Sequence, residues 1–280
     1  MRKTLFSGIA ACLLATAATA AEQSPSVIWT VGQADRSASE FALAPDRFRD
    51  FLANDFGYED KYFLVGHSVP AADFPYVLPG PADTWGGTWP TSGWRTHQVN
   101  ILFGLKEIPS DGTCTLVVDL LDYAKNFLPL VKVSVNTQDA KFQLDAPGLS
   151  VADQRKPNQM EKIVDTLSIT GNLAKATPRR LEIPIRPGVL KAGGNEVTIT
   201  VLEGSWILFD RVSLEGPAGT NVEQPQQLFI RNIEAAPYEL ADGKRRVQPL
   251  LVDLEWLEGA PALSVELDGK EILNLSLIHI

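Results

Sequence analysis

One stretch of the sequence decides the fold class: Gly193-Gly194-Asn195-Glu196-Val197-Thr198-Ile199-Thr200, followed by Gly204-Ser205-Trp206 and Ile207-Leu208-Phe209-Asp210-Arg211-Val212-Ser213-Leu214-Glu215. Both runs are rich in β-branched and aromatic residues, and apolar and polar residues alternate along them. A Gly-Gly-Asn turn beside such runs is typical of consecutive antiparallel strands that each bury one face. The stretch therefore predicts the closing strands of a β-sandwich.

The same pattern recurs through residues 27–216, where turn residues separate strand-like runs and no long helical period intervenes. The predicted strands are Val27–Val31, Tyr62–Val65, His97–Leu105, Thr113–Leu121, Leu130–Asn136, Arg180–Ile185, Glu196–Leu202 and Trp206–Leu214. Eight such strands fit an all-β fold of the jelly-roll type. We therefore predict one β-sandwich domain over residues 22–216.

The composition changes after this domain. Residues 217–227 are mostly Gly, Ala, Asn, Pro and Gln, which predicts a linker. Strand-like runs at 228–233, 247–256 and 263–267 then predict the start of a second, incomplete β-sandwich over 228–274. Residues 275–280 resemble the translation of a transposon end used in preparing sequencing libraries, so we expect them to be an artefact and the natural protein to continue beyond Asn274.

Residues 1–21 have the organisation of a secretory signal peptide. Arg2 and Lys3 form a basic start, residues 5–17 are apolar, and Ala18-Thr19-Ala20 is a small-residue cleavage site. The mature chain is therefore expected in the periplasm or outside the cell. A lipoprotein signal ending at Cys12 is the less favoured alternative, because the apolar run before Cys12 is very short.

Charge and cysteine content exclude several partners. The formal net charge is −9, and removal of Arg2 and Lys3 makes it −11, which disfavours nucleic acid and anionic lipid as partners. After the signal, no run approaches the roughly 18 apolar residues that a membrane span needs. Cys114 is the only cysteine left beyond Cys12, so no intrachain disulfide is expected, and its apolar flank predicts a core position.

Residues 69–93 form a long connection that combines prolines and glycines with aromatic residues. Loops of this length are usually functional or disordered, and the aromatics argue against disorder. Sugar rings stack on Trp and Tyr while carboxylates and Arg bind hydroxyls, which makes this region the predicted carbohydrate-binding site: Tyr76, Asp83, Trp85, Trp89, Trp94 and Arg95. The alternative is that these rings close one end of the sandwich and pack the loop against it.

Three acidic residues suggest a structural calcium site. If the first and last strands pair, Asp35, Glu40 and Asp210 gather near one edge, and carboxylate oxygens are ligands that Ca²⁺ prefers. The alternative is that these carboxylates accept hydrogen bonds from turn amides at residues 32–39. No other cofactor is expected.

The sequence contains few residues or motifs that indicate catalysis. The chain has only three histidines and lacks a Gly-x-Ser-x-Gly elbow, a His-Glu-x-x-His helix and a phosphate-binding loop. A lyase needs a base beside a uronate, and Lys61, Tyr62, Arg95 and His97 are conceivable candidates, although surface charge explains them equally well. The catalytic residues stay unassigned.

Several segments together resemble the C-terminal β-sandwich of rhamnogalacturonan lyases, domain III of polysaccharide lyase family 4. They include Ile28-Trp29-Thr30-Val31-Gly32-Gln33-Ala34-Asp35, Phe63-Leu64-Val65-Gly66, Asp73-Phe74-Pro75-Tyr76-Val77, Gly112-Thr113-Cys114-Thr115-Leu116, Val133-Ser134-Val135-Asn136 and the stretch from Gly194 to Asp210. The resemblance implies a galactose-binding-like jelly roll of the carbohydrate-binding type. It transfers no ligand residues. In that family the module follows a catalytic domain, whereas here it follows the signal peptide.

These observations predict a non-catalytic carbohydrate-binding or accessory module at the N-terminus of a secreted polysaccharide lyase or glycoside hydrolase. Its expected partners are a plant-type oligosaccharide or polysaccharide and a downstream catalytic domain of the same polypeptide. Two alternatives stay open. The sandwich could itself be a lyase or hydrolase, or it could be a purely structural module between domains.

Overall fold

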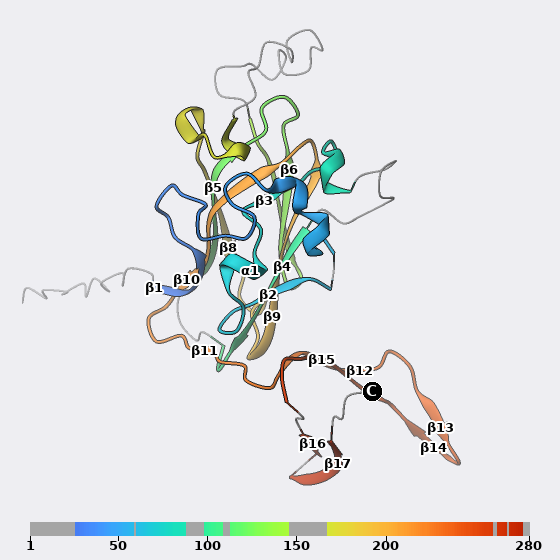
Figure 1. The fold of residues 1–280 in the computed structure, drawn as a ribbon. Helices are drawn as coiled ribbons and strands as arrows, with labels where there is room; N and C mark the ends of the chain where they lie inside the picture. Colours follow the sequence, from blue (N-terminus) through green and yellow to red (C-terminus); the bar gives the residue numbers. More distant parts are fainter. Residues whose placement is uncertain are drawn as a thin grey trace, which may run out of the picture.

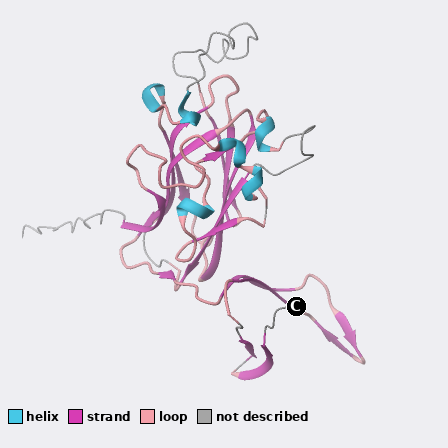
Figure 2. Ribbon diagram, viewed as in Figure 1, coloured by secondary structure: helices cyan, strands magenta, loops and turns pink. Residues whose placement is uncertain are grey.

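Two β-sheets packed against each other form the body of the molecule, and the short helices lie in the connections between strands (Figure 1, Figure 2). The computed structural model describes residues 26–58, 60–87, 98–108, 113–145, 167–259, 262–267 and 269–276. The helical segments are η1 (Phe48–Asp50), η2 (Leu52–Asn54), α1 (Pro70–Asp73), η3 (Thr84–Gly86), η4 (Leu167–Thr170) and η5 (Leu173–Lys175).

The first sheet has five strands in the order β1-β10-β5-β8, with β3 also paired to β10. The strands are β1 (Ser26–Gly32), β3 (Val77–Leu78), β5 (Cys114–Tyr123), β8 (Arg179–Ile185) and β10 (Ile207–Gly216). β1 pairs antiparallel with β10, which is the pairing that the calcium hypothesis requires. β1 pairs with residues 211–216 of β10, and β3 pairs with the first two residues of β10, Ile207 and Leu208.

The second sheet has six strands in the order β11-β4-β9-β6-β7, with β2 running parallel to β4. Its strands are β2 (Tyr62–Leu64), β4 (Gln98–Leu105), β6 (Leu130–Val135), β7 (Gln138–Gln143), β9 (Gly193–Glu203) and β11 (Val222–Glu223). All eight strands predicted for the sandwich are present, and the all-β sandwich is confirmed. The structure adds β3, β7 and β11.

The core lies between the two sheets and follows from the alternation in the sequence. In β6, Val131, Val133 and Val135 are buried, whereas the residues between them face outward. Trp29 and Trp206 are also buried, as their positions within strand patterns predict. Cys114 is a core residue too, and burial raises the pKa of its thiol.

The turn predicted at Gly193-Gly194-Asn195 is wrong. These residues begin β9 and pair with β4, where Gly194 lies opposite Gly104 and Asn195 lies opposite Phe103. The turn that joins β9 to β10 contains Gly204, whose φ of 81° favours glycine. At Gly194 glycine is needed for a different reason: the backbone of a later strand lies so close that there is no room for a side chain.

The segment predicted as a linker, 217–227, contains β11, which pairs with β4 and so belongs to the second sheet. The chain then forms three two-stranded ladders. They pair β12 (Leu228–Ala235) with β15 (Leu250–Trp256), β13 (Leu240–Asp242) with β14 (Arg245–Val247), and β16 (Ala262–Leu267) with β17 (Lys270–Ser276). We call the β12–β15 pair the ribbon. No helix in the described ranges has the length and hydrophobicity that crossing a membrane requires.

Candidate functional site: a polar groove between the sandwich and the ribbon

Tyr76 and Trp85, the described aromatic residues of the predicted sugar-binding site, lie at one end of the sandwich and contact protein. Tyr76 is 1% exposed, and its hydroxyl donates a hydrogen bond of 2.7 Å to the carbonyl of Ile169. Trp85 is partly buried and packs edge-on against Phe48, with ring centroids 5.0 Å apart. Neither ring therefore has a wholly open face for stacking.

Asp83 is also buried at this end. Its carboxylate accepts hydrogen bonds from the Gly80 amide at 2.8 Å and from the Ser205 hydroxyl at 2.6 Å, which holds residues 80–83 against the turn between β9 and β10. Trp89, Trp94 and Arg95 lie outside the described residues. The sugar-binding role of this loop stays a prediction, and the contacts of Tyr76, Asp83 and Trp85 are those of the packing alternative.

The three carboxylates predicted to hold calcium do gather beside the start of the sandwich. Each accepts a hydrogen bond from a backbone amide of the loop after β1: Glu40 from Gln33 at 2.9 Å, Asp35 from Ser37 at 2.9 Å, and Asp210 from Arg36 at 3.0 Å. These are the turn-amide contacts of the alternative interpretation. Within the described ranges, no group of three or more His, Cys, Asp or Glu side chains is arranged to hold a metal ion.

A polar hollow lies elsewhere, on the outer face of the second sheet. Its floor is set by strand register: Ser134 of β6 lies opposite Thr198 of β9, and Leu102 of β4 lies opposite Glu196 of β9. Ser134 donates a hydrogen bond of 2.7 Å to Asp139, and this bond, followed by the contact with Lys132, lowers the pKa of Asp139. The outward positions of β6 and β9 thus present hydroxyl and carboxylate groups, and Leu102 of β4 adds an apolar side chain.

The wall of this hollow comes from the ribbon. Arg231 and Asn232 of β12 and Asp253 of β15 face the floor across a groove of about 380 Å³. We call this space the groove. Lys191, in the connection before β9, donates a hydrogen bond of 2.9 Å to the side chain of Asn232 and joins the wall to the sandwich.

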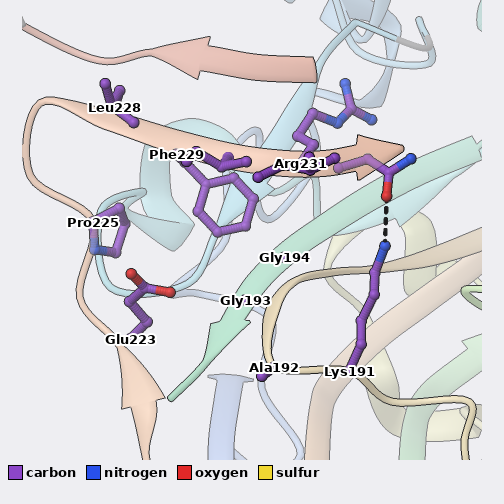
Figure 3. A pocket seen from close by; sticks show the side chains of 12 residues that line it. Lys191, Ala192, Gly193, Gly194, Glu223, Pro225, Leu228, Phe229 and Arg231 are labelled. Carbon is purple, nitrogen blue, oxygen red and sulfur yellow. Dashed lines mark hydrogen bonds between the residues drawn. The ribbon is translucent and has the colours of Figure 1, made fainter. Parts of the chain in front are cut away.

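A second hollow of about 340 Å³ adjoins the groove on the other side of β12 and is shown in Figure 3. Lys191 and Arg231 line both spaces, and the sticks show Lys191 reaching toward β12 from the connection below it. Phe229 and Pro225 make this second hollow more apolar than the groove.

Two glycines let the chain after β10 approach the second sheet closely. A Cβ on Gly194 would collide with the carbonyl oxygens of Ile230 and Arg231, and a Cβ on Gly104 would lie 2.8 Å from the Cβ of Glu223. Any larger residue would therefore displace β11 or β12. This close approach is the physical reason for glycine at Gly194 within a strand.

Apolar packing holds the ribbon beside the glycines. Phe229 is 3% exposed and packs with Leu64 and Leu102 from the outer face of the sheet. Tyr62 and Leu257 cover this cluster. Burial, and then the charge of Glu255 and a hydrogen bond to it, raise the pKa of Tyr62 to about 12.

Arg231 is the central charge of the groove wall. Its guanidinium lies 2.8 Å from Glu255, 3.3 Å from Glu196 and 3.8 Å from Asp253. Burial lowers the pKa of Arg231, but these carboxylates outweigh that effect and raise it. Arg231 therefore links the ribbon to β9 through Glu196 and has its charge balanced within the protein.

Sequence reasoning missed this groove because its residues come from five strands that are distant in the chain. In β6 and β9 the outward positions carry Lys132, Ser134, Glu196, Thr198 and Thr200, but polar residues are also what any solvent-facing sheet carries, so this series does not mark a binding site.

Comparison with known proteins agrees with this architecture. The sequence profile of the family described as "CBM-like: Polysaccharide lyase family 4, domain III" matches residues 27–214. The chain belongs to this family. The match covers the sandwich from Val27 in β1 to Leu214 in β10 and does not include β11, and it confirms the resemblance expected from the sequence. The sandwich is thus a carbohydrate-binding-like module.

Other comparisons add little to the family assignment. No curated protein matches the chain. Among solved structures, the chain is similar to "A novel family GH115 4-O-Methyl-alpha-glucuronidase, BtGH115A, with specificity for decorated arabinogalactans", with 17% identity and a TM-score of 0.24. That alignment covers 42% of this chain and 13% of the other, and so low a TM-score carries no argument.

Proposed function

We propose that this CBM-like domain binds oligosaccharide in the groove and serves as a non-catalytic accessory module. The observation that carries the proposal is a groove of about 380 Å³, lined by hydroxyl, amide and charged side chains, on the sheet face of a carbohydrate-binding-like sandwich. Sugar hydroxyls are recognised by such groups. The lining includes no Trp or Tyr among the described residues, so hydrogen bonding rather than stacking would supply the affinity.

The test is a calorimetric titration of the chain without residues 1–21 against pectic, mannan and gum-derived oligosaccharides. Thr198→Val removes one floor hydroxyl with little change in volume and should weaken binding about fivefold, because a single hydrogen bond contributes roughly 1 kcal/mol. Thr30→Val is the matched control, since Thr30 is exposed on the other sheet. Flat titrations against every sugar would refute the proposal.

The aromatic loop is the competing location for the same function. Trp89→Ala and Trp94→Ala should leave the affinity unchanged if the groove is the site. If they abolish binding while Thr198→Val does not, the sugar binds at the loop. Trp85→Ala is a poor probe, because removal of its ring also empties the contact with Phe48 and Phe51.

We further propose that the module is part of a larger secreted polysaccharide lyase or glycoside hydrolase. The signal-like residues 1–21 support secretion, and the mass of the exported protein should correspond to a chain that begins at Ala21 or Glu22. Exposed apolar side chains on the ribbon, Ile233 at 55%, Leu250 at 51% and Leu251 at 39%, support packing against a further domain of the same polypeptide.

The same exposed side chains favour a second candidate function, in which the chain is a structural module between domains. This reading predicts tight association with the downstream domain and no affinity for any oligosaccharide. The titrations above therefore separate it from the binding function.

A further inference from the structure

We infer that the groove is a composite site, complete only when the ribbon is docked on the sandwich, and that it takes an uncharged, hydroxyl-rich oligosaccharide. The inference rests on the proposed function and deepens it, because it assigns part of the binding site to the segment after the carbohydrate-binding-like sandwich. That segment lies outside residues 27–214, the range that the family profile covers.

The division of the lining supports a composite site. The sandwich supplies the floor through Ser134, Glu196 and Thr198, and the ribbon supplies the facing wall through Arg231, Asn232 and Asp253. Without the ribbon, the floor is an open sheet face with nothing opposite it. A sugar in the groove would therefore contact both parts of the chain at once.

The contacts between ribbon and sandwich are specific enough to hold the wall in one position. Gly194 admits the β12 backbone, and Phe229 is buried beside it. Around this contact, Lys191 donates a hydrogen bond to Asn232, as the dashed line in Figure 3 shows. Arg231 donates a second one to Glu196, so two polar links join the ribbon to the sandwich. These links fix the distance between wall and floor.

The charge of the lining selects the class of ligand. Two cationic side chains, Lys191 and Arg231, are matched by two anionic ones, Glu196 and Asp253. Arg231 is already shared among Glu196, Asp253 and Glu255, so a uronate carboxylate would have to compete with carboxylates of the protein. Sugar hydroxyls, which can both donate and accept, fit this balanced lining better.

A ligand that needs the docked ribbon must also stabilise docking. The two equilibria are linked, so any change that lowers the docked fraction lowers the apparent affinity by the same factor. Saturating sugar should in turn slow hydrogen exchange of the amides in residues 228–235.

The experiment uses the chain without residues 1–21, neutral and uronate-rich oligosaccharides of equal length, and two substitutions. Gly194→Val suits a strand backbone but places side-chain atoms where the ribbon backbone lies, and it should weaken neutral-sugar binding about tenfold or more. Leu202→Val is its control, on the same outward side of β9 and outside the groove lining. Circular dichroism checks that both variants fold.

Asn232→Ala provides a second measurement that does not depend on Gly194→Val folding. It removes one wall side chain and should weaken binding about fivefold, whereas Asn221→Ala, an exposed asparagine outside the groove, should not. Retained affinity in both Gly194→Val and Asn232→Ala would overturn the composite site but leave carbohydrate binding intact. Tighter binding of uronate-rich oligomers would overturn the ligand class, and no binding by the unsubstituted chain would overturn the proposed function itself.

Discussion

Asp210 is a buried carboxyl surrounded by other carboxyl groups. Burial is the main reason that its pKa is raised from 3.8 to about 6, with Asp35, Asp119 and Glu40 adding to the effect and the hydrogen bond from Arg36 opposing it. The folded protein therefore holds this proton more tightly than the unfolded chain does. Ionisation of Asp210 costs stability, and the free energy of unfolding should decrease as pH rises from about 4 to about 6.

Asp210→Asn tests this assignment, since Asn keeps an oxygen for the Arg36 amide but has no charge. Relative to the unsubstituted protein, the variant should gain on the order of 2 kcal/mol of unfolding free energy at pH 7.5 and much less at pH 4. Urea unfolding at both pH values measures the difference. The exposed Asp242→Asn serves as control. An equal effect of Asp210→Asn at both pH values would contradict the assignment.

Among single residues, the sequence predicts burial well where the residue lies in a strand-like run. Trp29 lies in β1, Cys114 begins β5 and Trp206 directly precedes β10, and all three are in the core. The prediction that Tyr76 binds sugar depends only on its residue type and its position in a loop. Its burial depends on a hydrogen bond to Ile169, 93 residues later in the chain, which no local pattern reveals.

Among the elements, the buried carboxylate of Asp122 fastens the segment with η4 and η5 to the end of β5. Lys125 lies 2.7 Å from Asp122, and both side chains are less than a tenth exposed. Asp122 also accepts a hydrogen bond of 2.6 Å from Ser168 and one of 3.0 Å from the amide of Thr177. One carboxylate thus connects β5 to both ends of that segment.

Lys125→Met should lower the free energy of unfolding by about 3 kcal/mol, because it removes the ion pair of 2.7 Å that Lys125 forms with the buried Asp122 carboxylate. Lys132→Met is a matched control. Its partner Asp139 is half exposed, at 52%, so the loss should be below about 1 kcal/mol. Chemical denaturation of both variants provides the comparison, and equal losses would show that the buried pair has no special role.

The strands absent from the sequence prediction share a physical cause. β3 has two residues and β11 has two, so neither is long enough to show a period. β7 carries mostly polar residues because it is the last strand of its sheet, and only Gln138 in it is buried. The glycine pair at the start of β9 looked like a turn because the need for close approach arises only from the distant β12.

At the scale of the whole molecule, fold class and family follow from the sequence, but the groove does not. Its floor requires the register of β4, β9 and β6, and its wall requires the ribbon to cross that face. Ser134 and Asp253 line the same groove only because the strand register and the position of the ribbon bring them together. The sequence therefore identified a carbohydrate-binding-like module and assigned the site to loop aromatics.

Sugar binding in the groove is tested most directly by an amide NMR titration of the chain without residues 1–21 with a neutral oligosaccharide. Signals from β6, β9, β12 and β15 should shift together, with the largest changes near Ser134, Thr198 and Asn232. Shifts confined to residues 84–97 would place the sugar at the aromatic loop, and an unchanged spectrum would show that the groove binds no sugar. Either result would refute sugar binding in the groove.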